Sequence, residues 1–177
     1  MTTTAVPERV RWAIEMLAVD PGDRILEIGC ARGVALALIG ERLRSGRITG
    51  VDRSRVAIAA ATARTRALVR AGRVHLHTSA LADATLEGPF DKVFAINVNV
   101  FWLKPARELA VIRGVLARRG RLYLFYEPPS PSQRKRLIDT CTAFLEDARF
   151  TVTQVLSASA RGIGLIAAPA PTSRRTD

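Results

Sequence analysis

Short apolar runs and longer amphipathic stretches alternate along this chain. Apolar runs without a helical period predict strands that are buried on both faces, and they cover residues 24–28, 47–52, 73–77, 90–97 and 121–126. The stretches around them place apolar residues at helical spacing, and they predict helices over residues 7–18, 33–44, 54–71, 105–119 and from 130 onward. Strand and helix therefore alternate five times.

The last part of the chain follows a different pattern. Residues 150–158 and 162–168 form two alternating or apolar runs joined by a short polar loop, which predicts a terminal hairpin. Alternating strands and helices that end in a hairpin indicate an α/β fold. We predict a doubly wound, mostly parallel seven-stranded sheet with a C-terminal antiparallel hairpin strand and helices on both faces.

The length of 177 residues fits one domain. We expect that domain over residues 20–169, with a helical segment before it over residues 1–19 and a disordered tail over residues 170–177, where Pro, Ala, Ser, Thr and Arg dominate. The chain has no apolar run of about 20 residues, no signal-peptide pattern and no cysteine spacing of a metal or redox site. A cytoplasmic protein is therefore expected.

The net charge of +11 raises the question of nucleic-acid binding. Nearly all of the positive charge is arginine spread along the chain, and the few aromatic residues are not interleaved with it. No base-stacking platform is predicted, so direct nucleic-acid binding stays a weakly supported alternative. Two histidines, His75 and His77, share one face of a strand, but no Cys or His cluster completes a metal site and none is predicted.

The stretch from Asp23 to Gly33 reads DRILEIGCARG and joins the first predicted strand to a run of good helix formers. Small residues at positions 29, 31 and 33 let the backbone approach a ligand closely, and a helix N-terminus offers free N–H groups. This is the layout of a nucleotide-binding loop, although an ordinary strand, turn and helix that bind nothing would look similar. A branched Cβ at Gly29 would fill the space of such a ligand.

Spacing distinguishes between the nucleotides that such a loop binds. The dinucleotide fingerprint would place its third small residue at Val34, which disfavours an NAD-dependent oxidoreductase and leaves it as an alternative. The spacing acid-x-Gly-x-small-x-Gly, formed by Glu27, Gly29, Ala31 and Gly33, resembles the first motif of the class I S-adenosylmethionine (SAM)-dependent methyltransferases. That family more often has Gly at the position of Ala31, whose methyl group is tolerated only at negative φ.

The second predicted strand ends at Asp52. Parallel strands joined by a right-handed crossover bring their carboxyl ends together, so the carboxylate of Asp52 can accept hydrogen bonds from both hydroxyls of a ribose. Capping of the next helix is the alternative role, but Ser54 already offers a cap. Because the residue ends a strand at the surface, we expect it to contribute little to stability without a ligand.

The resemblance extends from about residue 20 to 169 and implies SAM as the cofactor, with S-adenosylhomocysteine (SAH) as the product. It implies a helix before the first strand that folds over the methionine end of SAM, unless that helix only covers the sheet. Ser79 stands where the family usually has the Asp that contacts adenine, and Asp83 either supplies that charge or caps a short helix. The implied cofactor-binding residues are Glu27, Gly29, Cys30, Ala31, Gly33, Asp52, Arg53, Ser79, Ala80, Leu81, Asn97 and Val98.

In the family, the end of the fourth strand lies beside the transferable methyl group. Asn97 and Asn99 are therefore our positioning candidates, and they would project from one face if the strand continued through Val98. Tyr126 and Glu127 are weaker candidates, and no catalytic base can be named. Phe101 and Trp102 belong either to an acceptor pocket or to the core. The run from 117 to 120, Ala-Arg-Arg-Gly, stands where the family has its turn into the fifth strand.

We therefore predict a SAM-dependent methyltransferase with a small-molecule acceptor. An RNA-directed methyltransferase and a protein that binds SAM without transferring its methyl group are alternatives. Because the chain is close to a bare catalytic core, the site could also be completed by a second subunit, as in a homodimer.

Overall fold

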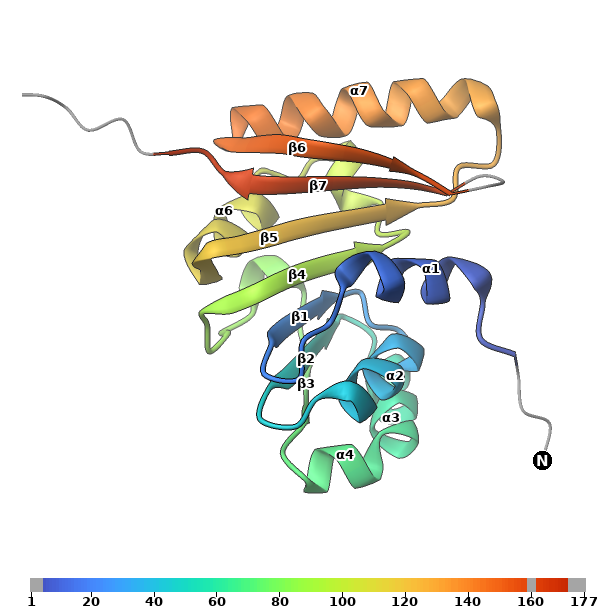
Figure 1. Ribbon diagram of the computed structural model, residues 1–177, viewed down its shortest axis with the longest axis vertical. Coiled ribbons are helices and arrows are strands. Elements are labelled where there is room, and N and C mark those ends of the chain that lie inside the picture. Colours follow the sequence, from blue (N-terminus) through green and yellow to red (C-terminus); the bar gives the residue numbers. More distant parts are fainter. Residues whose placement is uncertain (1–4, 159–161, 172–177) are drawn as a thin grey trace, which may run out of the picture.

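The protein is described here by a computed structural model that covers residues 5–158 and 162–171. Helices and strands alternate along these residues (Figure 1). In chain order they are α1 (Glu8–Leu17), β1 (Arg24–Ile28), α2 (Val34–Arg42), β2 (Arg47–Asp52), α3 (Arg55–Arg64), α4 (Arg66–Arg70), β3 (Val74–Thr78), the 3₁₀ helix η1 (Leu81–Asp83), β4 (Phe90–Ile96), α5 (Val100–Leu103), α6 (Ala106–Val115), β5 (Leu116–Tyr126), α7 (Pro131–Asp147), β6 (Phe150–Ser157) and β7 (Ile163–Pro169).

The strands form one seven-stranded sheet in the order β3-β2-β1-β4-β5-β7-β6. Neighbours from β3 to β5 run parallel, whereas β7 is antiparallel to both β5 and β6 (Figure 1). This confirms the predicted mostly parallel sheet with an antiparallel strand at the C-terminal hairpin.

Helices cover both faces of the sheet, and each face has its own apolar cluster. Ile25, Phe94 and Phe125 point to the face covered by α1 to α4. Their chain neighbours, among them Leu26 and Leu124, point to the face covered by η1 and by α5 to α7. Successive residues of a strand point to opposite faces, so a continuous apolar run is what a sheet buried on both sides requires. The doubly wound architecture is confirmed.

Strand order reverses between β1 and β4, which are neighbours in the sheet although β2 and β3 lie between them in the chain. In open α/β sheets, ligands bind outside the carboxyl ends of the strands at such a reversal. The carboxyl ends of β1, β2 and β4 therefore mark the edge where a functional site is expected.

The helix predicted over residues 54–71 is divided into α3 and α4 at Thr65. The hydroxyl groups of Thr62 and Thr65 donate hydrogen bonds to the carbonyl oxygens of Ile58 and Ala61, at 2.8 Å each. Threonine side chains that bond back to the preceding turn bend or weaken a helix. The apolar spacing alone could not reveal this break.

The helix predicted over residues 105–119 ends at Val115, and residues 117–120 belong to β5 rather than to a turn before it. Leu116 pairs with Phe90, after which the register between β4 and β5 shifts before Lys92 pairs with Arg121. Leu116 also packs against the apolar cluster of that face. Pairing with β4 therefore extends the chain where its local sequence favours a helix.

The C-terminal hairpin follows the prediction more closely. The hairpin expected over residues 150–158 and 162–168 is formed by β6 and β7. The tail expected over residues 170–177 lies outside the described residues from 172 onward. At its start, the backbone N–H of Ala170 donates to the carbonyl oxygen of Arg149 at 2.9 Å.

Candidate functional site

The loop between β1 and α2 alternates left-handed and ordinary backbone. The φ angles of Gly29, Ala31 and Gly33 are 70°, 46° and 72°. The N–H groups of Gly29 and Cys30 donate to the carbonyl oxygen of Val51, at 2.8 and 3.2 Å, so the loop is bonded to the end of β2. The small residues of the motif therefore allow a backbone path that most side chains disfavour.

Ala31 contradicts the expectation that its φ would be negative. An alanine in the left-handed region brings its Cβ close to the following carbonyl oxygen, which costs about 1–2 kcal/mol. The backbone N–H of Ala31 donates to Asp52 Oδ2 at 2.9 Å. This bond and the neighbouring glycines hold the residue in its strained conformation.

Replacing Ala31 with glycine should therefore raise the stability of the protein. We expect Ala31→Gly to increase the free energy of unfolding by about 0.5–1 kcal/mol, which is the strain relieved less the extra entropy of an unfolded glycine. Denaturant unfolding at equilibrium measures this change. A lower stability in Ala31→Gly would show that the left-handed alanine carries no strain.

The glycines on either side of Ala31 are close to other parts of the protein. A Cβ on Gly29 would lie 2.7 Å from Cγ2 of Val98, and one on Gly33 would lie 2.9 Å from the Cβ of Ala61. The space beside Gly29 is thus filled by Val98 and not by an open ligand volume, which corrects the reason expected for this glycine. Val98 follows β4, so Gly29 joins the β1–α2 loop to the end of β4.

Asp52 organises the same edge through two backbone hydrogen bonds. Its Oδ2 accepts from the N–H of Ala31 and its Oδ1 accepts from the N–H of Ser54, both at 2.9 Å. Ser54 caps α3, because its hydroxyl oxygen accepts from the N–H of Ala57 at 3.2 Å. These bonds give Asp52 a structural role that the sequence did not indicate, because its removal would leave two backbone donors without this acceptor.

Glu27 is 5% exposed, and its Oε2 has no hydrogen-bond partner among the described residues. Burial, and to a lesser degree the charge of Asp52, raises the pKa of Glu27 from 4.5 to about 8. A buried carboxyl group without a partner is costly and marks a position where a ligand group can bind.

Cys30 takes part in the loop only through its backbone. Its thiol is buried against Gly50, where an added Cβ would lie 3.0 Å from Sγ. Burial, with smaller contributions from Glu27 and Asp52, raises the pKa of this thiol. Cys30 is thus a protonated core residue, and its side chain takes no part in the loop.

The segment after β3 lies beside the end of β2. The N–H of Ser79 donates to the carbonyl oxygen of Asp52 at 3.1 Å, and the Ser79 hydroxyl donates to the carbonyl oxygen of Ala80 at 2.9 Å. Leu81 is buried at the start of η1, whereas Arg53 is exposed. Asp83 pairs with Arg107 at 3.0 Å, and both side chains are exposed.

β4 ends at Ile96, one residue before its predicted end, and does not continue through Val98. Asn97 adopts φ 55°, and its Oδ1 accepts from the N–H of Glu127 at 2.9 Å. The alternation that a continued strand would have given does not occur, because the chain turns at Asn97 and enters α5 after Asn99. Even so, both asparagines line one cavity while Val98 contacts the β1–α2 loop.

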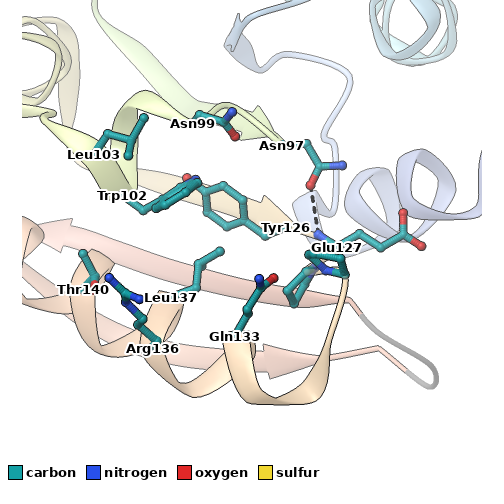
Figure 2. Close-up of a pocket in the computed structure, with 12 residues that line it drawn as sticks. Asn97, Asn99, Trp102, Leu103, Tyr126, Glu127, Gln133, Arg136, Leu137 and Thr140 are labelled. Carbon is teal, nitrogen blue, oxygen red and sulfur yellow. Dashed lines mark hydrogen bonds between the residues drawn. The ribbon is translucent and has the colours of Figure 1, made fainter.

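This cavity has a volume of about 520 Å³ and lies between the β4–α5 segment and α7 (Figure 2). Its lining residues are Asn97, Asn99, Trp102, Leu103, Tyr126, Glu127, Pro128, Pro129, Gln133, Arg136, Leu137 and Thr140. The sequence did not place the four on α7 at this cavity, because only the tertiary fold packs this helix against α5. Of the two aromatic residues after this turn, Phe101 is buried in the core, whereas Trp102 lines the cavity.

Two polar side chains of the cavity already have partners. The Tyr126 hydroxyl donates to the carbonyl oxygen of Val98 at 3.0 Å, and burial raises the pKa of Tyr126 well above 10.0. Glu127 pairs with Arg9 of α1 at 3.6 Å. Tyr126 therefore stays protonated at neutral pH and serves as a fixed donor.

Within residues 5–158 and 162–171, no group of three or more His, Cys, Asp and Glu side chains could hold a metal ion. None of the helices in this part of the chain is long and apolar enough to cross a membrane.

Structural comparison identifies many proteins with the same fold. A SAM-dependent methyltransferase from Aquifex aeolicus superposes with a TM-score of 0.74 at 16% identity, over 89% of this chain and 88% of that one. The ribosomal protein L11 methylase from Lactobacillus delbrueckii subsp. bulgaricus superposes with a TM-score of 0.70 at 17% identity, over 92% of this chain and 78% of that one. Magnesium protoporphyrin IX methyltransferase from Synechocystis PCC 6803, solved with bound SAM, superposes with a TM-score of 0.65 at 19% identity, over 89% of this chain and 74% of that one.

Sequence comparison with curated proteins finds no match. A family model described as a methyltransferase domain matches residues 26–122, from the middle of β1 into β5. This match spans more than half of the chain and includes the β1–α2 loop, Asp52 and the turn at Asn97. The chain therefore belongs to the methyltransferase domain family and is a class I SAM-dependent methyltransferase.

Proposed function

We propose that this enzyme methylates a small molecule bound in the cavity between α7 and the β4–α5 segment. The observation that carries the proposal is the turn after β4. Val98 contacts Gly29 in the β1–α2 loop, while its two neighbours, Asn97 and Asn99, line the cavity. A ligand on that loop and a ligand in the cavity would thus lie on either side of one turn.

Side chains at the carboxyl edge of the sheet offer hydrogen-bond acceptors that suit the cofactor SAM. The unpartnered Oε2 of Glu27 can accept a hydrogen bond from a ligand donor, and the carboxylate oxygens of Asp52 keep lone pairs for the ribose hydroxyls. The left-handed loop from Gly29 to Gly33, Arg53 and the segment from Ser79 to Leu81 would form the rest of the cofactor site. The side chains of Cys30 and Val98 would pack behind this loop and would not contact the cofactor themselves.

When bound, SAM would supply an electrophilic methyl group on a sulfonium ion. Transfer of this group to the acceptor nucleophile would leave the carbon–sulfur electron pair on sulfur, giving SAH, and any proton of the nucleophile would pass to solvent. Alignment of the two reactants is the main requirement, and Asn97 and Asn99 are placed for it at one side of the cavity.

One carboxylate lines the cavity where the acceptor would bind, that of Glu127, and it is paired with Arg9. Among the described residues no histidine or cysteine lines the cavity, and the Tyr126 hydroxyl is protonated and bonded to the carbonyl oxygen of Val98. An acceptor that is nucleophilic without a base, such as a thiol, an amine or an acidic hydroxyl, fits these surroundings.

The contacts of the N-terminal helix α1 support a role for it in covering the site. Arg9 pairs with Glu127 on the cavity wall at 3.6 Å, and the ring of Trp12 contacts Phe125 edge-on at a centroid distance of 5.3 Å. We propose that α1 holds the end of β5 in place next to the bound cofactor. The cytoplasmic location, the homodimer and the RNA-directed alternative stay predictions.

Removing the Asp52 carboxylate should weaken both the cofactor site and the fold. Asp52→Ala should reduce SAM affinity about 10- to 100-fold, the scale of a charge-assisted hydrogen bond. It should also lower the free energy of unfolding by about 1–2 kcal/mol, because the N–H groups of Ala31 and Ser54 lose their acceptor. Calorimetric titration and denaturant unfolding measure the two effects.

Asp91→Ala is the matched control, since Asp91 also accepts a backbone N–H, that of Arg24 at 2.9 Å, but near the opposite end of β1. It should reduce stability without changing SAM affinity. Wild-type protein that does not bind SAM, or that binds NAD equally well, would contradict the proposed site. Normal SAM affinity in folded Asp52→Ala would contradict the ribose role alone.

A further inference from the structure

The walls of the cavity are largely apolar. Trp102 and Leu103, two of the five large apolar side chains exposed in the described chain, both line it and are 37% and 58% exposed. Leu137, Pro128 and Pro129 complete these walls. An exposed indole and an exposed leucine at one cavity favour a ligand with a flat apolar body, which would remove their surfaces from water.

Two charged side chains line the same cavity, and they differ in their partners. Glu127 pairs with Arg9 at 3.6 Å. Arg136 forms no ion pair or hydrogen bond with any described residue, although its neighbours on α7 do, since Lys135 pairs with Asp139 at 2.6 Å and Arg134 donates to Ser157. Of these two charges, that of Arg136 therefore has no partner among the described residues, and its side chain is exposed to solvent at the cavity.

The remaining polar groups lie on two sides of the cavity. Arg136 and Thr140 rise from α7, and Asn97 and Asn99 lie on the opposite side, at the turn after β4 (Figure 2). The Oδ1 of Asn97 is occupied by the N–H of Glu127, which leaves its amide N–H groups as donors. A guanidinium group binds a carboxylate with two parallel hydrogen bonds.

We propose that the methyl acceptor is a small aromatic carboxylic acid whose carboxylate is bound by Arg136. This inference rests on the proposed function. The ring lies against Trp102 and Leu137, and the atom that receives the methyl group faces Asn97 and Asn99. A volume of about 520 Å³ suits a ligand of this size. Arg136 thus determines which acceptors bind and takes no part in the transfer itself.

The test compares an acid with its uncharged amide. 2-Naphthoate and 2-naphthamide are titrated calorimetrically into the protein, with and without saturating SAH. The wild type should bind the acid at least tenfold more tightly, the scale of one charge-assisted pair. Arg136→Met should lose this preference and keep its affinity for the amide. In a SAH-release assay, hydroxy- and amino-naphthoic acids should be methylated faster than their amides, and Arg136→Met should remove that difference.

Lys135→Met is the matched control, because it removes the same charge from the adjacent, exposed position of α7 outside the cavity. It should keep the preference for the acid. Equal binding of acid and amide, no binding of either, or a preference that survives Arg136→Met would overturn the inference. A SAM titration of the same samples separates the two proposals, since normal SAM binding without acid preference leaves the cofactor site intact and overturns only the acceptor class.

Discussion

Between pH 4.5 and pH 8, the free energy of unfolding of the ligand-free protein should fall by about 3–5 kcal/mol, and Glu27→Gln should remove most of this fall. The cause is the burial of Glu27, whose pKa is raised from 4.5 to about 8 and whose Oε2 has no partner among the described residues. Each unit of difference between the folded and unfolded pKa corresponds to about 1.4 kcal/mol.

The direction of the change follows from where the proton is held. Below pH 4.5 both the folded and the unfolded chain carry the proton on Glu27, and the contribution to stability is fully present. As the pH rises, the unfolded chain releases its proton first, and the contribution is lost by the time the pH passes the folded pKa of about 8. Stability therefore decreases with pH across this window.

Denaturant unfolding at several pH values within the window measures the effect. The pKa of Cys30 is raised, and that of Cys141 is raised to about 11. These two thiols therefore affect stability only at higher pH and do not contribute to the change expected between pH 4.5 and pH 8. Glu87→Gln is the control, because its side chain is 85% exposed. If wild type and Glu27→Gln lose stability in parallel as the pH rises, Glu27 is not the buried acid that titrates.

The strands could be predicted because their physical requirement is local. A strand buried on both faces is apolar at most positions, and the runs around Leu26, Val51 and Phe94 have this composition, with Glu27 as a buried exception. This can be read without reference to the rest of the chain. The location of Asp52 followed from a topological rule, since the carboxyl ends of parallel strands meet at one edge.

The helix boundaries depended on interactions that apolar spacing does not report. Thr65 ends α3 through a hydrogen bond from its side chain to Ala61. Leu116 is extended because it pairs with Phe90, which is 26 positions earlier in the chain. Neither partner is visible in a local pattern, so the predicted helices were too long.

The candidate site was predictable where a motif has fixed spacing and unpredictable where distant segments meet. Glu27, Gly29 and Gly33 followed from the loop, and Asn97 and Asn99 from the end of a strand. Arg136 could not be found, because α7 reaches the cavity only through the tertiary fold. The left-handed backbone of Ala31 was also missed, since a hydrogen bond to Asp52 helps to hold it.

Gly29→Ala should lower the free energy of unfolding by about 2–4 kcal/mol, about half of it through Val98. Two terms contribute. A Cβ at φ 70° is strained, which costs about 1–2 kcal/mol. The same Cβ would lie 2.7 Å from Cγ2 of Val98, a contact that forces the valine or the loop to move.

The two terms separate in a double-mutant cycle. Val98→Ala removes Cγ2, so Gly29→Ala in that background should cost only the backbone strain, about 1–2 kcal/mol. The two substitutions should therefore couple favourably by about 1–2 kcal/mol, and denaturant unfolding of the four proteins measures this. Additive effects would show that Gly29 and Val98 do not compete for the same space.

A SAM titration of the double variant distinguishes two reasons for the glycine at position 29. If SAM affinity and stability both recover, the glycine is required because Val98 occupies the space beside it. If stability recovers and affinity does not, the glycine is required because SAM lies against its backbone.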